Sequence, residues 1–232
     1  MVSLIGLIYV FDALIGIWMT YRFLTFYKNS GNLFAKNFGM FALFLTTSFL
    51  FLGAPSFLTL NSRVLRVGYW IALMFLFIGI TFLANIPSYF GRWKKSAPYF
   101  NWILRAGAIF FLSLSVIFPN KPYLTGEGIL IWGIHPVPGA LFAVFIFFFM
   151  LLISTVFFQT GHRARDKEIR IRSFLIGLSF VCASIGGALT HSFNNKDWVL
   201  AGHAILSFGF VLVALAMGFY PQTEKEAGNQ KK

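Results

Sequence analysis

Residues 138–191 read PGALFAVFIFFFMLLISTVFFQTGHRARDKEIRIRSFLIGLSFVCASIGGALTH, and this stretch decides the fold. It consists of two apolar runs joined by the basic segment QTGHRARDKEIRIRS, residues 159–173. Each run approaches the roughly 20 mainly apolar residues that a helix needs to cross the hydrocarbon core of a bilayer. The stretch therefore predicts two membrane-spanning helices joined by a short, positively charged loop.

The same pattern recurs along the whole chain. Backbone groups in hydrocarbon must find hydrogen-bond partners within their own segment, which a helix provides. We therefore predict an all-α fold: an integral membrane bundle of seven transmembrane helices within residues 1–220, followed by a polar tail, residues 221–232. The predicted spans are 3–26, 37–60, 65–89, 101–118, 138–159, 171–191 and 198–219.

The composition agrees with a membrane protein. The chain has 232 residues, of which 58% are hydrophobic and 11% charged, whereas a soluble domain carries about 25% charged residues. The net charge of +12 is compatible in principle with nucleic-acid binding. However, the basic residues lie in loops, where anionic lipid headgroups already account for them. We expect the lipid bilayer as a partner and no nucleic acid.

The lysines and arginines also predict the orientation. One side of the membrane receives 15 of them and the other receives 4. Cytoplasmic loops carry the excess of Lys and Arg, so we expect the N-terminus outside and the C-terminus in the cytoplasm, in the cell membrane. The 4 on the outer side are Arg63, Arg66, Lys121 and Lys196.

A few polar side chains within or beside the spans are candidates for a site. Asp12 is the acidic residue inside a predicted span. A charge at the bilayer centre costs roughly 2.5–3.5 kcal/mol on insertion scales, so Asp12 should face the bundle interior. In the predicted orientation His191 and His203 lie at a similar depth, in the outer half. Because the first and last helices of a closed bundle are usually neighbours, we expect these three residues to converge.

Several interpretations of such a convergence are open. Asp12 and a histidine can form an interhelical hydrogen bond, or Asp12, His191 and His203 can together bind Zn²⁺, for which carboxylate and imidazole are suitable ligands. The alternative is structural: His191 ends a helix and His203 is satisfied by a neighbouring backbone. The sequence lacks HxxxH and HExxH spacings, which would favour a metal.

Two loops extend this list. The outer loop, residues 119–137, holds Trp132 and His135 between Gly and Pro residues, and we expect it to be either a lid that contributes to ligand binding or an interfacial connector. The inner loop, residues 161–173, is either a determinant of topology or a surface for a cytoplasmic partner. Its candidate partner-binding residues are Arg163, Arg165, Arg170 and Arg172.

Residues 139–220 resemble a known class of membrane domain. An outer Gly-Ala-Leu-Phe opens an aromatic span, an Arg-rich loop and a Gly-containing span follow, and a last span runs to Tyr220. This order is similar to the seven-helix N-terminal sensor region of some bacterial histidine kinases and diguanylate cyclases. The resemblance implies a sensor. With the sequence ending at Lys232, we expect signalling through a separate cytoplasmic protein.

Three functions are therefore compatible with these residues. The first is a non-catalytic sensor or accessory protein that binds a small ligand or partner near Asp12, Trp132, His135, His191 and His203. The second is a metal-dependent hydrolase using the same Asp and His residues, and the third is a transporter with Asp12 as a protonatable group. A retinal protein is excluded, because the last span, residues 198–219, contains no lysine.

Overall fold

The structure is a computed structural model, and it describes residues 3–58, 61–90, 93–95 and 97–218. Its seven long helices are each long and apolar enough to cross a membrane. This confirms the predicted helical bundle of a multi-pass membrane protein. The end of the seventh span and the polar tail, residues 221–232, lie outside the described residues. The helices are α1 Leu4–Ser30, α2 Leu33–Leu58, α3 Ser62–Leu83, α4 Ala97–Ile117, α5 Pro136–Arg163, α6 Lys167–Ser192 and α7 Lys196–Gly218.

Most helices extend a few residues beyond the predicted spans, because polar residues at their ends cap them. Ser3 accepts a hydrogen bond from the amide of Gly6 at the start of α1, and Gly31 ends that helix in the left-handed conformation. Asp166 accepts hydrogen bonds from two amides in the first turn of α6. The third span differs, because α3 ends before Pro87 and continues as a short 3₁₀ helix, η1 (Ile86–Tyr89). Proline removes a backbone donor and disfavours helix in the residue before it.

Helices that follow each other in the chain pack side by side, and α1 also contacts α7. Close approach depends on small residues, as expected for helices in lipid. A Cβ atom added to Gly202 of α7 would lie 2.9 Å from the carbonyl oxygen of Gly186 in α6, and one added to Gly186 would lie 2.6 Å from the carbonyl oxygen of Gly202. The two helices therefore cross backbone against backbone.

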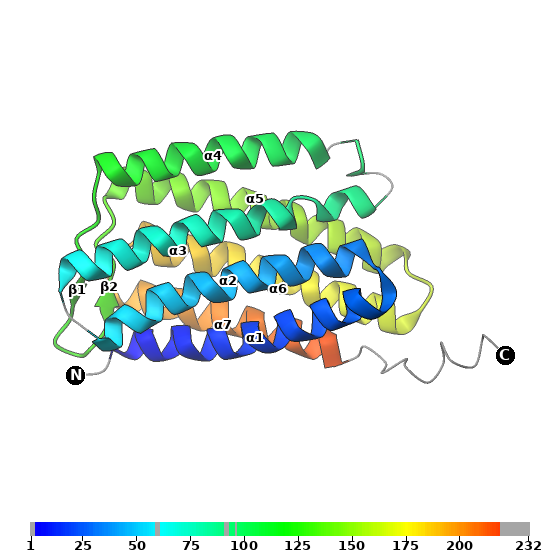
Figure 1. Cartoon of the computed structure of the whole chain (residues 1–232), viewed down its shortest axis with the longest axis horizontal. Coiled ribbons are helices and arrows are strands. Elements are labelled where there is room, and N and C mark those ends of the chain that lie inside the picture. Colours follow the sequence, from blue (N-terminus) through cyan, green and yellow to red (C-terminus); the bar gives the residue numbers. More distant parts are fainter. Residues whose placement is uncertain (1–2, 59–60, 91–92, 96, 219–232) are drawn as a thin grey trace.

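Helix α4 lies along one edge of the bundle (Figure 1) and is much less buried than the others. It is attached by a hydrogen bond of 2.7 Å that Asn101 donates to Asn85 and by Phe111, whose ring packs on Phe142 of α5. Its large apolar side chains, such as Trp102 and Ile109, are exposed. In a membrane protein this surface faces lipid.

The loop between α4 and α5 adds a feature that an all-α prediction lacks. It forms a short antiparallel hairpin of β1 (Tyr123–Leu124) and β2 (Leu130–Ile131). The hairpin covers one end of the bundle, beside the start of α1 (Figure 1), where the amide of Leu4 donates to the carbonyl of Gly128 at 3.0 Å. We call this the hairpin end. The opposite end, with the loop between α5 and α6, is called the basic end.

Candidate functional site

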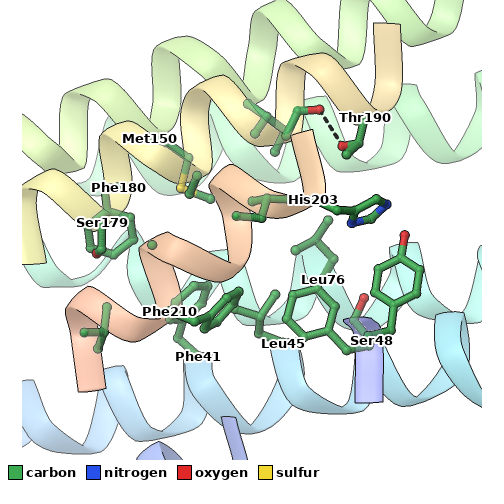
Figure 2. A pocket seen from close by; sticks show the side chains of 18 of the residues that line it. Phe41, Leu45, Ser48, Leu76, Met150, Ser179, Phe180, Thr190, His203 and Phe210 are labelled. Carbon is green, nitrogen blue, oxygen red and sulfur yellow. Dashed lines mark hydrogen bonds between the residues drawn. The ribbon is translucent and has the colours of Figure 1, made fainter. Parts of the chain in front are cut away.

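The bundle encloses a cavity of about 120 Å³ between six of its helices. All long helices except α4 contribute to its wall, which is mostly aromatic and aliphatic. Figure 2 shows its length: His203 and Thr190 lie at one end of the drawn side chains, and Phe180 and Ser179 lie at the other. The cavity thus runs along the bundle from a polar end, near the hairpin, into a phenylalanine-rich half.

The polar end is built by five side chains, which we call the polar-aromatic cluster: Tyr9, Tyr69, Trp132, His191 and His203. The indole N–H of Trp132 donates to the hydroxyl of Tyr9 at 3.1 Å. The indole also packs on Tyr69, with 5.1 Å between ring centroids. Trp132 follows directly after β2, so the hairpin brings a loop residue into contact with both α1 and α3.

The histidines of the cluster differ in their hydrogen bonds. The Nδ1 atom of His191 lies 3.3 Å from the hydroxyl of Tyr69. His203 packs edge-on against the ring of Tyr9, with 4.9 Å between centroids, and is only 1% exposed. None of the described residues forms a hydrogen bond with either ring nitrogen of His203. Leaving such a buried polar group unpaired costs about 1–3 kcal/mol.

Asp12 is brought near the cluster but does not join it. It is 1% exposed on α1, one turn beyond Tyr9 toward the basic end. Its carboxyl group lies near Ser207 of α7, but neither its Oδ1 atom nor the Ser207 hydroxyl has a hydrogen-bond partner among the described residues. Residues three or four apart share one helix face, so Tyr9 meets His203 while Asp12 meets Ser207 one turn further along.

This pairing corrects the expectation that Asp12, His191 and His203 share a metal ion. Within the described ranges, no three His, Cys, Asp or Glu side chains come close enough together to hold one. The physical reason is the axial offset: the ring of Tyr9 occupies the position next to His203, and Asp12 lies one turn deeper. His191 and His203 do line the same cavity, so two of the three residues are brought together.

His135 and Trp132 have roles that differ from those expected. His135 is exposed and caps α5, where its Nδ1 accepts from the amide of Val137 at 3.3 Å, and its ring packs on Phe118. It therefore lies outside the cavity. Trp132 is 4% exposed and supports residues of the cavity wall from behind. The loop, residues 119–137, is accordingly a packed cover for the hairpin end.

The arginines of the inner loop form a separate surface at the basic end. Arg163, Arg165 and Arg170 are exposed. Arg172 is partly buried and forms an ion pair of 3.0 Å with Glu168, one turn earlier in α6. Three of the four candidate residues are thus exposed at this end of the bundle, and the guanidinium of Arg170 also donates a hydrogen bond of 3.1 Å to the carbonyl of Ala164.

Sequence reasoning did not identify Tyr9 and Tyr69 as site residues. Both are buried, at 4% and 5% exposed, and they connect Trp132 to the two histidines. A signal for Tyr9 is present in the sequence, because it lies three residues before Asp12 and so shares its helix face. Tyr69 has no comparable signal, since its contact with His191 joins residues far apart in the chain.

No protein-family model, curated protein sequence or solved structure matches this chain. The arrangement therefore has to be interpreted from its own chemistry: a multi-pass helical membrane protein with an interior cavity, a covered hairpin end and a basic end.

Proposed function

We propose that this protein is a non-catalytic, sensor-like membrane protein that binds a small ligand in the interior cavity. The observation that carries the proposal is His203, whose two ring nitrogens are buried at the cavity wall without partners among the described residues. A ligand that hydrogen-bonds with this imidazole recovers the cost of burying it.

The contacts of the cluster also suggest how occupancy changes the bundle. His203 touches Tyr9, and Tyr9 is held by Trp132 of the hairpin cover. The same cavity is lined further along by Phe180 of α6, the helix that begins at the basic loop. A ligand in the cavity therefore contacts α6 directly and acts on the hairpin cover through Tyr9. We expect a cytoplasmic signalling protein to respond through the exposed arginines of the inner loop, next to the start of α6.

The proposal places the hairpin end outside the cell membrane and the basic end in the cytoplasm, because of the 15 to 4 division of Lys and Arg. Cysteine labelling tests this in a Cys182→Ser background. Gly126→Cys, in the hairpin turn and with open space around it, should react with an impermeant maleimide in intact cells. Arg165→Cys should react only after permeabilisation, and the reverse pattern would refute the orientation.

Photolabelling tests ligand binding. The probe is an octanol that carries a diazirine, added to the protein in lipid nanodiscs. We expect labels on cavity residues such as Met150 and Phe210. Gly187→Leu should abolish them, because Gly187 lines the cavity and a Cβ there meets only Ile146, at 3.5 Å. Gly218→Leu is the matched control, with open space outside the cavity.

Labels confined to the lipid-facing side of α4 would refute a ligand site in the bundle. Coupling between the cavity and the basic end is measured separately, with a fluorophore attached at Arg165→Cys. Its emission should change when the probe occupies the cavity and should stay constant in Gly187→Leu. A constant emission in the unblocked protein would refute coupling between the cavity and the basic end.

A further inference from the structure

The shape of the cavity and the hydrogen bonds missing at its polar end together specify the ligand. We infer that the cavity takes a single-chain amphiphile with a small, uncharged head group that both donates and accepts a hydrogen bond, such as an alcohol or a protonated fatty acid of about six to eight carbons. The head group lies at His203 and the chain extends toward Phe180. This inference rests on the proposed function and adds the ligand's chemical class.

The length of the cavity follows from the residues that line it. Tyr9 and Met19 both line it from α1, and His203 and Val213 both line it from α7. At about 1.5 Å per residue, each pair spans about 15 Å along the bundle. An extended chain advances about 1.2 Å per bond, so about twelve carbons is the longest extended chain that this length admits.

The cavity is narrow for its length. A volume of about 120 Å³ is comparable with the roughly 150 Å³ engineered cavity that holds one benzene molecule. Here the same order of space is spread over about 15 Å. By that comparison the cavity holds about six to eight carbons, and its length favours a linear chain over a compact ring.

The head group follows from the two ring nitrogens of His203. A neutral imidazole has one donor and one acceptor nitrogen, and neither has a partner among the described residues. The hydroxyl of Tyr9 lies in the same wall and already accepts from Trp132, which leaves its own hydrogen free to be donated. A hydroxyl or a protonated carboxyl group can donate and accept at this position.

Charged head groups do not fit. The cavity residues include no Asp, Glu, Lys or Arg, and an unpaired charge in such a site is strongly disfavoured. Asp12 faces Ser207 and does not line the cavity. The chain itself supplies little driving force, because lipid tails are as apolar as the wall. The shape of the cavity therefore selects the ligand's apolar chain. The hydrogen bonds of the head group favour this ligand over the lipids of the bilayer.

Competition against the diazirine-octanol probe tests the inference. Nanodiscs of two-chain lipids are required, because single-chain detergents would compete. At equal mole fraction in the nanodisc, octanol and protonated octanoic acid should each displace the probe at least about tenfold better than octane, the effect of about two buried hydrogen bonds. The alcohols should show an optimum near about eight carbons and weaken beyond it.

Variants of His203 test the head-group assignment. His203→Phe should bring octanol and octane to within about twofold, because neither hydrogen bond with the imidazole can form. His203→Gln keeps a donor and an acceptor and should retain most of the alcohol preference. If His203→Phe does not fold, the length optimum and the alcohol-to-alkane ratio of the unmodified protein still decide the question.

The outcomes separate this inference from the proposed function. If the probe never labels cavity residues, the proposed function fails and the inference fails with it. If the probe labels the cavity but octane equals octanol, phenol displaces better than octanol, or octylamine displaces best, then only the ligand class is overturned. An alcohol preference that survives in His203→Phe overturns the role of His203.

Discussion

The two halves of the cavity wall are both aromatic, yet they are built for different purposes. Toward the basic end, Phe38 and Phe180 of the wall contact each other and Phe157 behind them, edge-on or stacked, at 5.8–6.4 Å between centroids. Toward the hairpin end, the polar-aromatic cluster adds hydrogen-bonding groups, and His203 is left without partners among the described residues. The phenylalanine half only packs, while the polar half keeps hydrogen-bonding groups that a ligand can use.

The energetic difference between the halves is that packing is complete in one and hydrogen bonding is incomplete in the other. A phenylalanine cluster gains from ring geometry, at about 0.5–1.5 kcal/mol per favourable pair. An unpaired imidazole costs about 1–3 kcal/mol. The protein without ligand is therefore less stable at its polar end than the same fold with an apolar residue in place of His203.

Removing the residue that connects the polar end should have the largest effect. Trp132→Ala deletes the indole between Tyr9 and Tyr69 together with its hydrogen bond to Tyr9. We expect a loss of about 3–5 kcal/mol in the free energy of unfolding, measured by denaturant titration in mixed micelles.

Trp198→Ala is the control, because that side chain is 50% exposed and its loss should cost less than about 0.5 kcal/mol. Equal effects of the two substitutions would show that Trp132 is a surface anchor and that the hairpin is not an integral cover.

A pair of glycine substitutions compares a closed contact with the open cavity. Gly202→Ala places a Cβ 2.8 Å from Thr190 and 2.9 Å from the carbonyl oxygen of Gly186, so α6 and α7 must separate. We expect a loss of about 1–3 kcal/mol, as for overpacking. Gly187→Ala meets only Ile146, at 3.5 Å, and should be neutral or stabilising by up to about 1 kcal/mol, since alanine favours helix.

Both variants are measured by unfolding in the same micelles. If Gly187→Ala destabilises as much as Gly202→Ala, then the interior beside Gly187 is filled and the cavity is absent.

Exchanging the aromatic types between the two halves tests their difference directly. His203→Phe should stabilise the ligand-free protein by about 1–3 kcal/mol, because two unpaired polar atoms leave the interior. Phe180→His should destabilise it by a similar amount of about 1–3 kcal/mol, because it introduces polar atoms among phenylalanines. Unfolding of delipidated samples measures both, and a destabilising His203→Phe would mean that His203 already has its partners.

The fold was predictable from the sequence because its determinants are local. Twenty-residue apolar runs such as 138–159 specify helices without reference to the rest of the chain, and caps such as Ser3 and Asp166 adjust the ends by a few residues. Pro87 lies inside the predicted span 65–89, and there the structure departs from the prediction, because α3 ends at Leu83 and η1 follows. The hairpin was missed because its strands have only two residues each and are fixed by packing on α1.

The site was predictable only in part, because it depends on how helices are rotated and offset. His191 and His203 line one cavity, but Asp12 does not, because a shift of one helical turn places it toward Ser207 while Tyr9 packs against His203. Composition and spacing contain no information about such an offset. Tyr69 was missed for the same reason, since its partner His191 is supplied by a different helix.

The smallest effect should come from the hydroxyl of Tyr69. Tyr69→Phe removes the hydrogen bond to Nδ1 of His191 and should cost about 0.5–1.5 kcal/mol in the free energy of unfolding. Tyr99→Phe, on the exposed side of α4, is the control and should change nothing measurable.

The size of this loss depends on what His191 does without its partner. His191 also borders a smaller cavity of about 30 Å³, together with Asn120, whose side-chain amide has no partner among the described residues. If the imidazole turns toward that amide, the cost falls to the lower end of the range. The double variant Tyr69→Phe with Asn120→Ala should then lose more than the sum of the two single losses, and additive losses would show that His191 stays in place as a fixed part of the cavity wall.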